Sequence, residues 1–412
     1  MNIEVTPENI NAFLHFGWLP RTDLSPPIPE IWIPDSPSNH SYEPREGGTL
    51  LRNAILESCA NHKELVVPLS GGLDSRVIAA VLREHNIDFL AVTLGTPGTY
   101  DYDLGASTAK ALGIPHNAID VTKLILDTDN LVSTAQRIND WTNIIEVQYN
   151  LHINNTYPDA KIVSGFLGDF LGGSYTGIDH SSWNHAVTDF IKLSKISSCL
   201  PSTRIDIETQ LLLDLKTPQE KNLTYYEELT MRTRHTCSLR PTVFPDDYNY
   251  ILPFLNQQWV EYMLGASREL RIRSRHYRDI LHTNWPKAFA LPAKNFNGGT
   301  IKDSIRKRKY HAQKNRVRSK LHRTFPDVAT TFMGIDPHQN YTDFRKQIIH
   351  NRGFRNIIQR NVLDLSERNI VSDINITDLY KKCFDHKTRP NYIEANTLLN
   401  LTNLEINLKA TI

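Results

Sequence analysis

The segment 65–82, LVVPLSGGLDSRVIAAVL, combines an apolar run, a turn of small residues and a helical pattern. This order predicts a β-strand, a tight loop and an α-helix. Small residues let a backbone curl closely around a phosphate. The helix that follows presents unpaired N–H groups and the positive end of its dipole to an anion. The segment therefore predicts an anion-binding loop at Leu69, Ser70, Gly71, Gly72, Asp74 and Ser75.

The spacing of this loop excludes two common phosphate loops. No lysine follows its second glycine, so it is not the loop G-x-x-x-x-G-K-[ST], and it also lacks the spacing G-x-G-x-x-G. Asp74 falls in the first helical turn, where a carboxylate can hold a hard cation that bridges phosphate oxygens. The plainer alternative is an ordinary strand-to-helix turn rich in small residues.

The residues after the loop predict a parallel, doubly wound α/β sheet. A second apolar strand is expected at 87–94, and a helix at 103–112 is expected to end at Gly113. Ligands of such sheets lie beyond the carboxyl ends of the strands. We therefore expect Thr93 and Leu94 to face the same crevice as Ser70, where their backbone groups can contact a bound ligand.

A second strand and glycine-rich loop occupies residues 161–175 and carries one acid, Asp169. Two aspartates at strand ends, Asp74 and Asp169, can reach one crevice. Such a pair suits Mg²⁺, which takes few carboxylates and fills its other positions with phosphate oxygens and water. For Asp169 alone, a helix-capping role is the alternative.

Both loops resemble a known family. SGGLDS resembles the pyrophosphate loop of the N-type ATP pyrophosphatases, and residues 165–173 resemble the second motif of asparagine synthetases and β-lactam synthetases. The resemblance implies an ATP-pyrophosphatase-type sheet with an appended helical C-terminal part, and it implies ATP and Mg²⁺ as cofactors. It places Gly165 along the nucleotide and makes Asp74 and Asp169 the metal ligands.

The order of segments 275–281, 285–286 and 291–298 resembles the run that ends the active site of this family. By this resemblance Lys294 stabilises charge on the adenylating carboxylate and on pyrophosphate, a role that a compact ammonium can serve. Arg275 matches a second cation for pyrophosphate. A solvated surface lysine is the alternative for Lys294.

The chain departs from the family where the family carries its general base. Phe166 stands where asparagine synthetases have Glu and β-lactam synthetases have Tyr, and Phe170 replaces the next acid. A phenyl ring cannot move protons, so we expect a different acceptor pocket. Either the base comes from elsewhere or the nucleophile is an amine that needs little help. Acids that could supply a base are Asp101, Asp103, Glu146 and Asp179.

We expect three parts: an N-terminal strap at 1–46, a synthetase domain at 47–300 and a helical part at 301–412. In the strap, FGWLP resembles the segment that follows the glutaminase domain of asparagine synthetases, so the chain is expected to begin where their synthetase half begins. Residues 177–240 read as polar helices, with a core-facing stripe at Trp183, Phe190, Leu193 and Ile196.

The amino-acid composition limits the kinds of partner that the protein is expected to bind. The chain has 46 Lys and Arg against 45 Asp and Glu, and its net charge of +1 gives no general attraction to nucleic acid or anionic membranes. The basic run 302–323 is expected to be a solvated helix face. The four cysteines form no C-x-x-C pair, and neither a leader pattern nor a run of about 20 apolar residues is present. We expect a cytoplasmic protein that binds neither membranes nor nucleic acid.

The resemblance implies a synthetase that adenylates a carboxylate, releases pyrophosphate and forms an amide. Its substrate would be a small-molecule or peptide carboxylate. The nitrogen would come from free ammonia, from a separate glutaminase subunit or from an amine. Relatives without the front domain act in peptide or β-lactam cyclisation and in surface-polysaccharide amidation, so specialised biosynthesis is expected. A tRNA-modifying ATP pyrophosphatase and a non-catalytic nucleotide-binding relative are the alternatives.

Overall fold

A five-stranded parallel sheet forms the centre of the computed structural model. The structure describes residues 3–21, 23–196, 212, 221–245, 249–336, 341–371, 374–385 and 389–411. The strand order is β3-β2-β1-β4-β5. The strands are β1 (Leu65–Pro68), β2 (Leu90–Gly95), β3 (His116–Asp120), β4 (Lys161–Val163) and β5 (Tyr250–Ile251). The predicted doubly wound α/β fold is confirmed.

The order of the strands reverses beside β1. The chain runs outward from β1 to β2 and β3, and then returns to place β4 on the other side of β1. Val66 is paired with Leu90 of β2 and with Ile162 of β4. The carboxyl ends of β1 and β4 therefore border the switch point, where ligands of open α/β sheets bind.

Side chains of β1 alternate between two hydrophobic cores, as the period of a strand requires. Leu65 and Val67 pack into one core and Val66 into the other. The first core is covered by helices that include α2 (Pro44–Cys59), α3 (Asp74–Glu84), α4 (Tyr100–Leu112), α12 (Gln257–Gly265), α14 (Arg275–Asn284) and α15 (Pro286–Phe289). As predicted, Gly113 ends α4, with the left-handed φ of 63° that glycine adopts freely.

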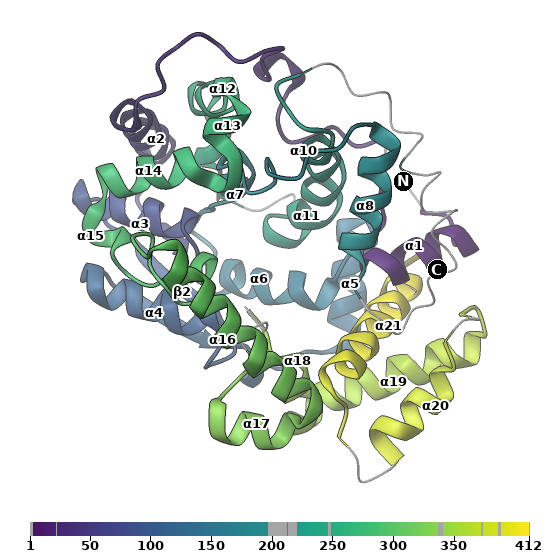
Figure 1. Ribbon diagram of the computed structural model, residues 1–412. Coiled ribbons are helices and arrows are strands. Elements are labelled where there is room, and N and C mark those ends of the chain that lie inside the picture. The colour runs from purple at the N-terminus through teal and green to yellow at the C-terminus, as the bar shows by residue number, and fades with distance from the viewer. Residues whose placement is uncertain are drawn as a thin grey trace.

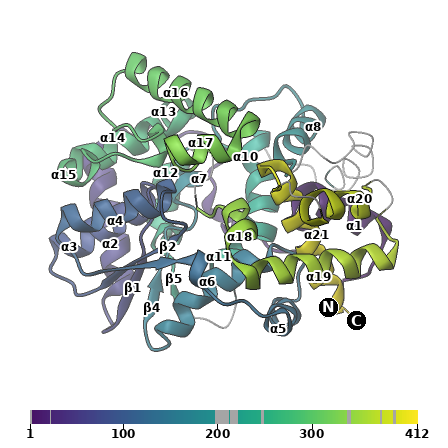
Figure 2. The same ribbon diagram turned by 90° about the horizontal axis from the view of Figure 1, so that it is seen from below.

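The second core joins the two ends of the described chain. Helices α5 (Thr128–Ile138) and α6 (Ile144–Thr156) pack there with the C-terminal helices, and α1 (Pro7–Phe16) lies against the last helix. Figures 1 and 2 show both ends of the chain on the same side of the molecule. The C-terminal helices are α18 (Phe344–His350), α19 (Arg352–Arg368), α20 (Ile376–Tyr380) and α21 (Tyr392–Thr411). The predicted helical C-terminal part is confirmed.

Within the segment 1–46, residues 7–16 form helix α1, which Thr6 caps and whose apolar face is buried. One expectation about a later segment needs correction. In helix α8 (Trp183–Ser194), Phe190 is buried, but Leu193 is 62% exposed. The stripe expected there is therefore only partly core, and Ile196, which follows α8, is also exposed. Much of the predicted helical region 177–240 lies outside the described residues. The division at residues 46 and 300 stays a prediction.

The basic run lies on helix α16 (Ile305–Thr324), where most side chains are exposed. It continues into α17 (Pro326–Met333). Between β4 and β5 lie α7 (Gly168–Leu171), α8, α10 (Tyr225–Leu229), the π-helix η4 (Thr230–Leu239) and α11 (Arg240–Val243); α13 (Arg268–Arg271) precedes α14. Among the described helices, none combines the length and apolar character needed to cross a bilayer.

Candidate active site

The loop between β1 and α3 is held in a tight curve by its own serines. The Ser70 N–H donates to Ser75 Oγ at 3.0 Å, and the two hydroxyl oxygens lie 3.2 Å apart. The Gly72 N–H donates to Ser70 Oγ at 3.2 Å. These bonds fix the loop at the point where α3 begins. The free N–H groups of the first turn of α3 therefore lie where a phosphate would bind.

Gly71 joins this loop to Lys294. A Cβ at Gly71 would lie 2.6 Å from the carbonyl oxygen of Tyr100, so only glycine fits there. The Gly71 N–H donates to Asp101 Oδ1 at 3.0 Å, and the Gly71 carbonyl accepts from the Lys294 N–H at 2.9 Å. The Lys294 Nζ lies 2.9 Å from both carboxylate oxygens of Asp101. Lys294 is thus held at the loop rather than in open solvent, and Asp101, one of the acids considered above, is the group that holds it.

Asp74 lies at the centre of the crevice. Its Oδ1 accepts a hydrogen bond from the Tyr277 hydroxyl at 2.8 Å. A Cβ built on Gly168 would lie 2.5 Å from Asp74 Cγ, so the loop after β4 packs directly on this carboxylate. Burial, followed by the charge of Asp169, raises the pKa of Asp74 to about 7.

Asp169 follows β4 and has more partners. Its Oδ1 accepts from the Phe170 N–H at 2.8 Å, and its Oδ2 accepts from the Tyr175 hydroxyl at 3.3 Å. The His235 Nε2 lies 3.7 Å from Oδ1. Burial favours the neutral acid, but hydrogen bonding and charge from His235, with the charge of Arg234, outweigh it and hold the pKa of Asp169 below its usual range.

The two carboxylates fit a hard divalent cation. Each belongs to a loop at the switch point, and the charge of Asp169 is felt at Asp74 as a rise in its pKa. A divalent cation between them would favour the ionised form of both groups, because it replaces like-charge repulsion with attraction. Carboxylates with open positions for phosphate oxygens and water are the donor set that Mg²⁺ prefers.

These groups line one cavity of about 380 Å³, which we call the nucleotide cavity. It lies at the carboxyl ends of β1, β2 and β4. Among the residues predicted from the sequence, those that line it are Leu69, Ser70, Gly72, Asp74, Ser75, Leu94, Gly165, Asp169 and Lys294. The structure therefore brings both predicted metal ligands, the loop and the lysine together.

Three predicted residues do not line this cavity: Gly71, whose backbone bonds are described above, Thr93 and Arg275. Thr93 is fully buried, its Oγ1 donates to the Leu69 carbonyl at 2.8 Å, and it lies 2.9 Å from His116 Nε2. Its side chain is therefore committed inside the sheet, and only its backbone is left for a ligand. Arg275 is exposed at the start of α14. Its role at pyrophosphate stays a prediction, whereas Tyr277, two residues later, does reach Asp74.

Aromatic rings form the far wall of the nucleotide cavity. Phe166 is buried, with its ring centroid 4.6 Å from Phe244 and 6.1 Å from His235. His235 is fully buried and hydrogen-bonds through Nδ1 to the carbonyl of Thr230 at 3.1 Å. Neither His235 nor Tyr277 was predicted as a site residue, although Tyr277 lies in the segment 275–281, because both reach the site only through tertiary packing.

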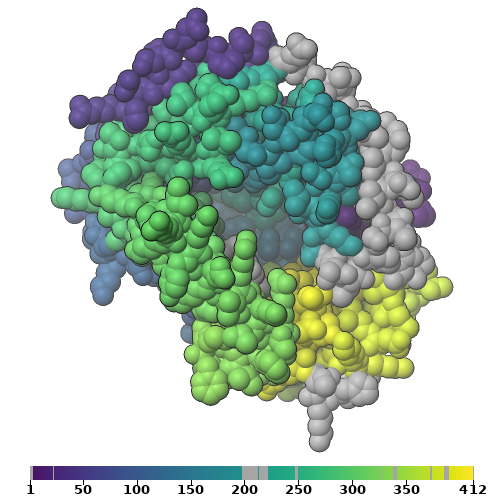
Figure 3. All heavy atoms as spheres, in the orientation of Figure 1, coloured from purple at the N-terminus to yellow at the C-terminus, as the bar shows by residue number. Residues whose placement is uncertain are grey.

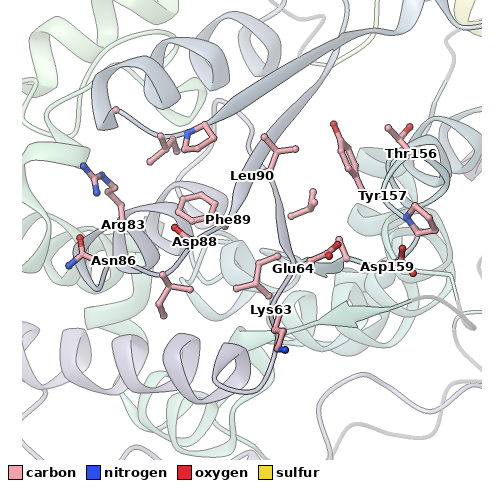
Figure 4. Close-up of a pocket in the computed structure, with 18 residues that line it drawn as sticks. Lys63, Glu64, Arg83, Asn86, Asp88, Phe89, Leu90, Thr156, Tyr157 and Asp159 are labelled. Atoms are coloured by element: carbon pink, nitrogen blue, oxygen red, sulfur yellow. The ribbon is translucent and has the colours of Figure 1, made fainter.

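Another cavity, of about 810 Å³, lies at the opposite edge of the sheet. Figure 4 shows it around the beginnings of β1 and β2, with Glu64 and Leu90 among its lining residues. It lies at the amino ends of the strands and contains none of the residues predicted for the site. The larger volume therefore does not make it the candidate active site.

A match to a known protein family covers the part of the chain that contains the loop of the candidate site. Residues 47–142 match the asparagine synthase family, which confirms the predicted resemblance for that segment and supports an ATP-dependent ligase. The segment includes the loop and Asp101 but neither Asp169 nor Lys294. No curated protein matches the chain. Among solved structures, the NMN synthetase from Francisella tularensis matches at 17% identity over 44% of this chain and 77% of that chain. The TM-score of 0.22 is too low to support any conclusion.

Proposed function

We propose that the protein is an ATP-dependent, AMP-forming amide synthetase. It activates a substrate carboxylate as an acyl-adenylate, releases pyrophosphate and transfers the acyl group to ammonia or an amine. The observation that carries the proposal is the convergence of four groups on one cavity at the switch point: the Ser70–Ser75 loop, Asp74, Asp169 and Lys294.

In this proposal the loop N–H groups and the first turn of α3 bind the phosphates of ATP. Asp74 and Asp169 would hold Mg²⁺, which would neutralise charge on the departing pyrophosphate when bound. Lys294 adds a fixed positive charge beside the loop. Asp101 positions Lys294 and one loop amide together, through contacts of 2.9 and 3.0 Å. These charges bind the phosphates of ATP and also stabilise the negative charge that develops on pyrophosphate as it leaves.

The acceptor half of the reaction is proposed to differ from asparagine formation. Phe166 lines the nucleotide cavity and packs against Phe244, so this position offers an apolar ring and no proton-accepting group. This supports a role in specialised biosynthesis, on a peptide natural product or a surface polysaccharide, rather than in asparagine supply. Nitrogen from a separate glutaminase subunit is compatible with this proposal.

The experiment is exchange of radiolabelled pyrophosphate into ATP with a panel of carboxylic acids. We expect exchange that depends on one acid and is lost in Asp74→Ala and Asp169→Ala. Asp88→Ala is the matched control, because Asp88 is an exposed acid at the other edge of the sheet. ATP binding without exchange for any acid would contradict the proposal and favour a non-catalytic nucleotide-binding protein. Adenylation of tRNA would favour the tRNA-modifying alternative.

A further inference from the structure

A second chamber of about 490 Å³ adjoins the nucleotide cavity. The two share Leu239 and Tyr341 as lining residues. The walls of the second chamber come from α6, η4, α21 and the turn after α1, so residues from both ends of the described chain build it. Figure 3 shows this face of the molecule hollowed between the teal, green and yellow parts of the chain.

The second chamber carries one acid and one base among its lining residues. The basic residue is Arg234, and its positive charge helps to lower the pKa of Asp169 in the neighbouring cavity. The acid, Glu146, is half-buried, and within the described residues its carboxylate makes no hydrogen bond or ion pair. Burial raises the pKa of Glu146 to about 7. A carboxylate in this position gains most from a ligand that brings a positive charge and N–H donors.

Helix α6 connects Glu146 to the nucleotide cavity. Asn150 lies one turn after Glu146, lines the nucleotide cavity, and donates from Nδ2 to the Glu146 carbonyl at 3.1 Å. One helical turn advances about 5.4 Å. On the shared wall, the Tyr341 hydroxyl is buried and has no hydrogen-bond partner among the described residues. It interacts electrostatically with Glu146 and with Asp101, so it lies between the two compartments.

We propose that the second chamber binds an organic ammonium group on Glu146, so that the acyl acceptor is a primary amine rather than free ammonia. The inference rests on the proposed function. The volume of the chamber supports it, because a molecule the size of water or ammonia occupies only about 30 Å³. Buried apolar side chains, among them Trp18, Phe344 and Leu399, line part of the chamber, beside several asparagines, and can cover the carbon part of the amine.

The transfer step balances with Glu146 as proton acceptor. The ammonium gives one proton to the Glu146 carboxylate and becomes a free amine. Its nitrogen lone pair forms the C–N bond to the acyl carbon of the adenylate. The C–O bond to the phosphate then breaks, and AMP leaves with that electron pair. The second N–H proton goes to the departing phosphate or to water, which leaves a neutral amide.

The test uses n-butylammonium chloride as the probe, with 1-butanol as its uncharged counterpart. Binding to the full chain without ATP is measured by saturation-transfer NMR and calorimetry. We expect n-butylammonium to bind and 1-butanol to bind at least tenfold more weakly. Glu146→Gln is expected to weaken n-butylammonium binding at least tenfold and to leave 1-butanol binding unchanged. Glu57→Gln is the control, because it removes the same charge from an exposed site outside both cavities.

Equal n-butylammonium binding by the wild type and Glu146→Gln would overturn the inference, as would no binding at all. Weaker n-butylammonium binding by Glu57→Gln would also overturn the inference, because it would indicate a general effect of charge. Pyrophosphate exchange separates this result from the proposed function. Exchange with a carboxylic acid but no probe binding rejects the amine site alone. Probe binding that depends on Glu146, without exchange for any acid, rejects the proposed activation alone.

Discussion

Adding one methyl group at Gly168 tests whether the position of Asp74 controls Mg²⁺-dependent ATP binding. In Gly168→Ala, the new Cβ would lie 2.5 Å from Asp74 Cγ and 2.7 Å from Oδ1. Carbon atoms in contact prefer a separation of about 3.5 Å or more, so the carboxylate must move by about 1 Å. Gly168 has no left-handed φ, so the effect is steric only.

A displacement of about 1 Å at a reacting or binding group can cost about a hundredfold. We therefore expect Gly168→Ala to lose at least tenfold in ATP affinity with Mg²⁺ present, or about 1.4 kcal/mol. Overpacking of this kind also costs about 1–3 kcal/mol in the free energy of unfolding. Without Mg²⁺, the affinity of the variant for ATP should stay close to that of the wild type.

The assay is calorimetric titration of ATP into both proteins with Mg²⁺ and with a chelator. Gly353→Ala is the control, because Gly353 is exposed on α19 and a Cβ there meets only the Asn351 side chain, at 3.4 Å. That variant should bind ATP normally and gain a few tenths to about 1 kcal/mol in stability. If Gly168→Ala keeps the full effect of Mg²⁺, either Asp74 is not a metal ligand or the packing does not constrain it.

Three further predictions concern the supports of the fold and the site. Glu227→Gln should cost about 3–5 kcal/mol of unfolding free energy by urea titration, because it leaves the fully buried Arg271, 2.7 Å away, without its counter-charge. Burial raises the pKa of Asp140 to about 7, so the folded state binds more protons than the unfolded state between about pH 4 and 7. Stability should therefore fall as the pH rises through that range, and Asp140→Asn should flatten the dependence of the urea midpoint on pH. Arg76→Lys should weaken MgATP binding about tenfold in the calorimetric titration. The buried guanidinium donates to the carbonyls of Leu291 and Pro292, which lead to Lys294, and one ammonium cannot reproduce both bonds. A variant whose stability, pH dependence or MgATP affinity equals that of the wild type would contradict the contacts on which its prediction rests.

The sequence was sufficient for the features that depend on local order. The strand, loop and helix around Ser70 are consecutive, and a parallel sheet then requires the loops of Asp74 and Asp169 to meet at one edge. The partners of these acids could not be predicted in the same way. Tyr277 reaches Asp74 from 203 residues away, and His235 reaches Asp169 from a π-helix. Both contacts depend on how helices pack over the loops, which no spacing in the chain encodes.

The two halves of the proposed reaction use different parts of the chain. The segment that matches the asparagine synthase family, residues 47–142, contains the phosphate loop that activation needs. Of the residues that line the second chamber, none lies within that segment. Activation of a carboxylate is the same step whatever the acceptor, so its loop can be shared among enzymes with different products. The acceptor changes with the product, and here its proposed site is built from Glu146 on α6, Arg234 on η4 and the outer helices. The phenyl ring of Phe166, which cannot accept a proton, is then consistent with a proton acceptor on Glu146, one helical turn from Asn150 in the wall of the nucleotide cavity.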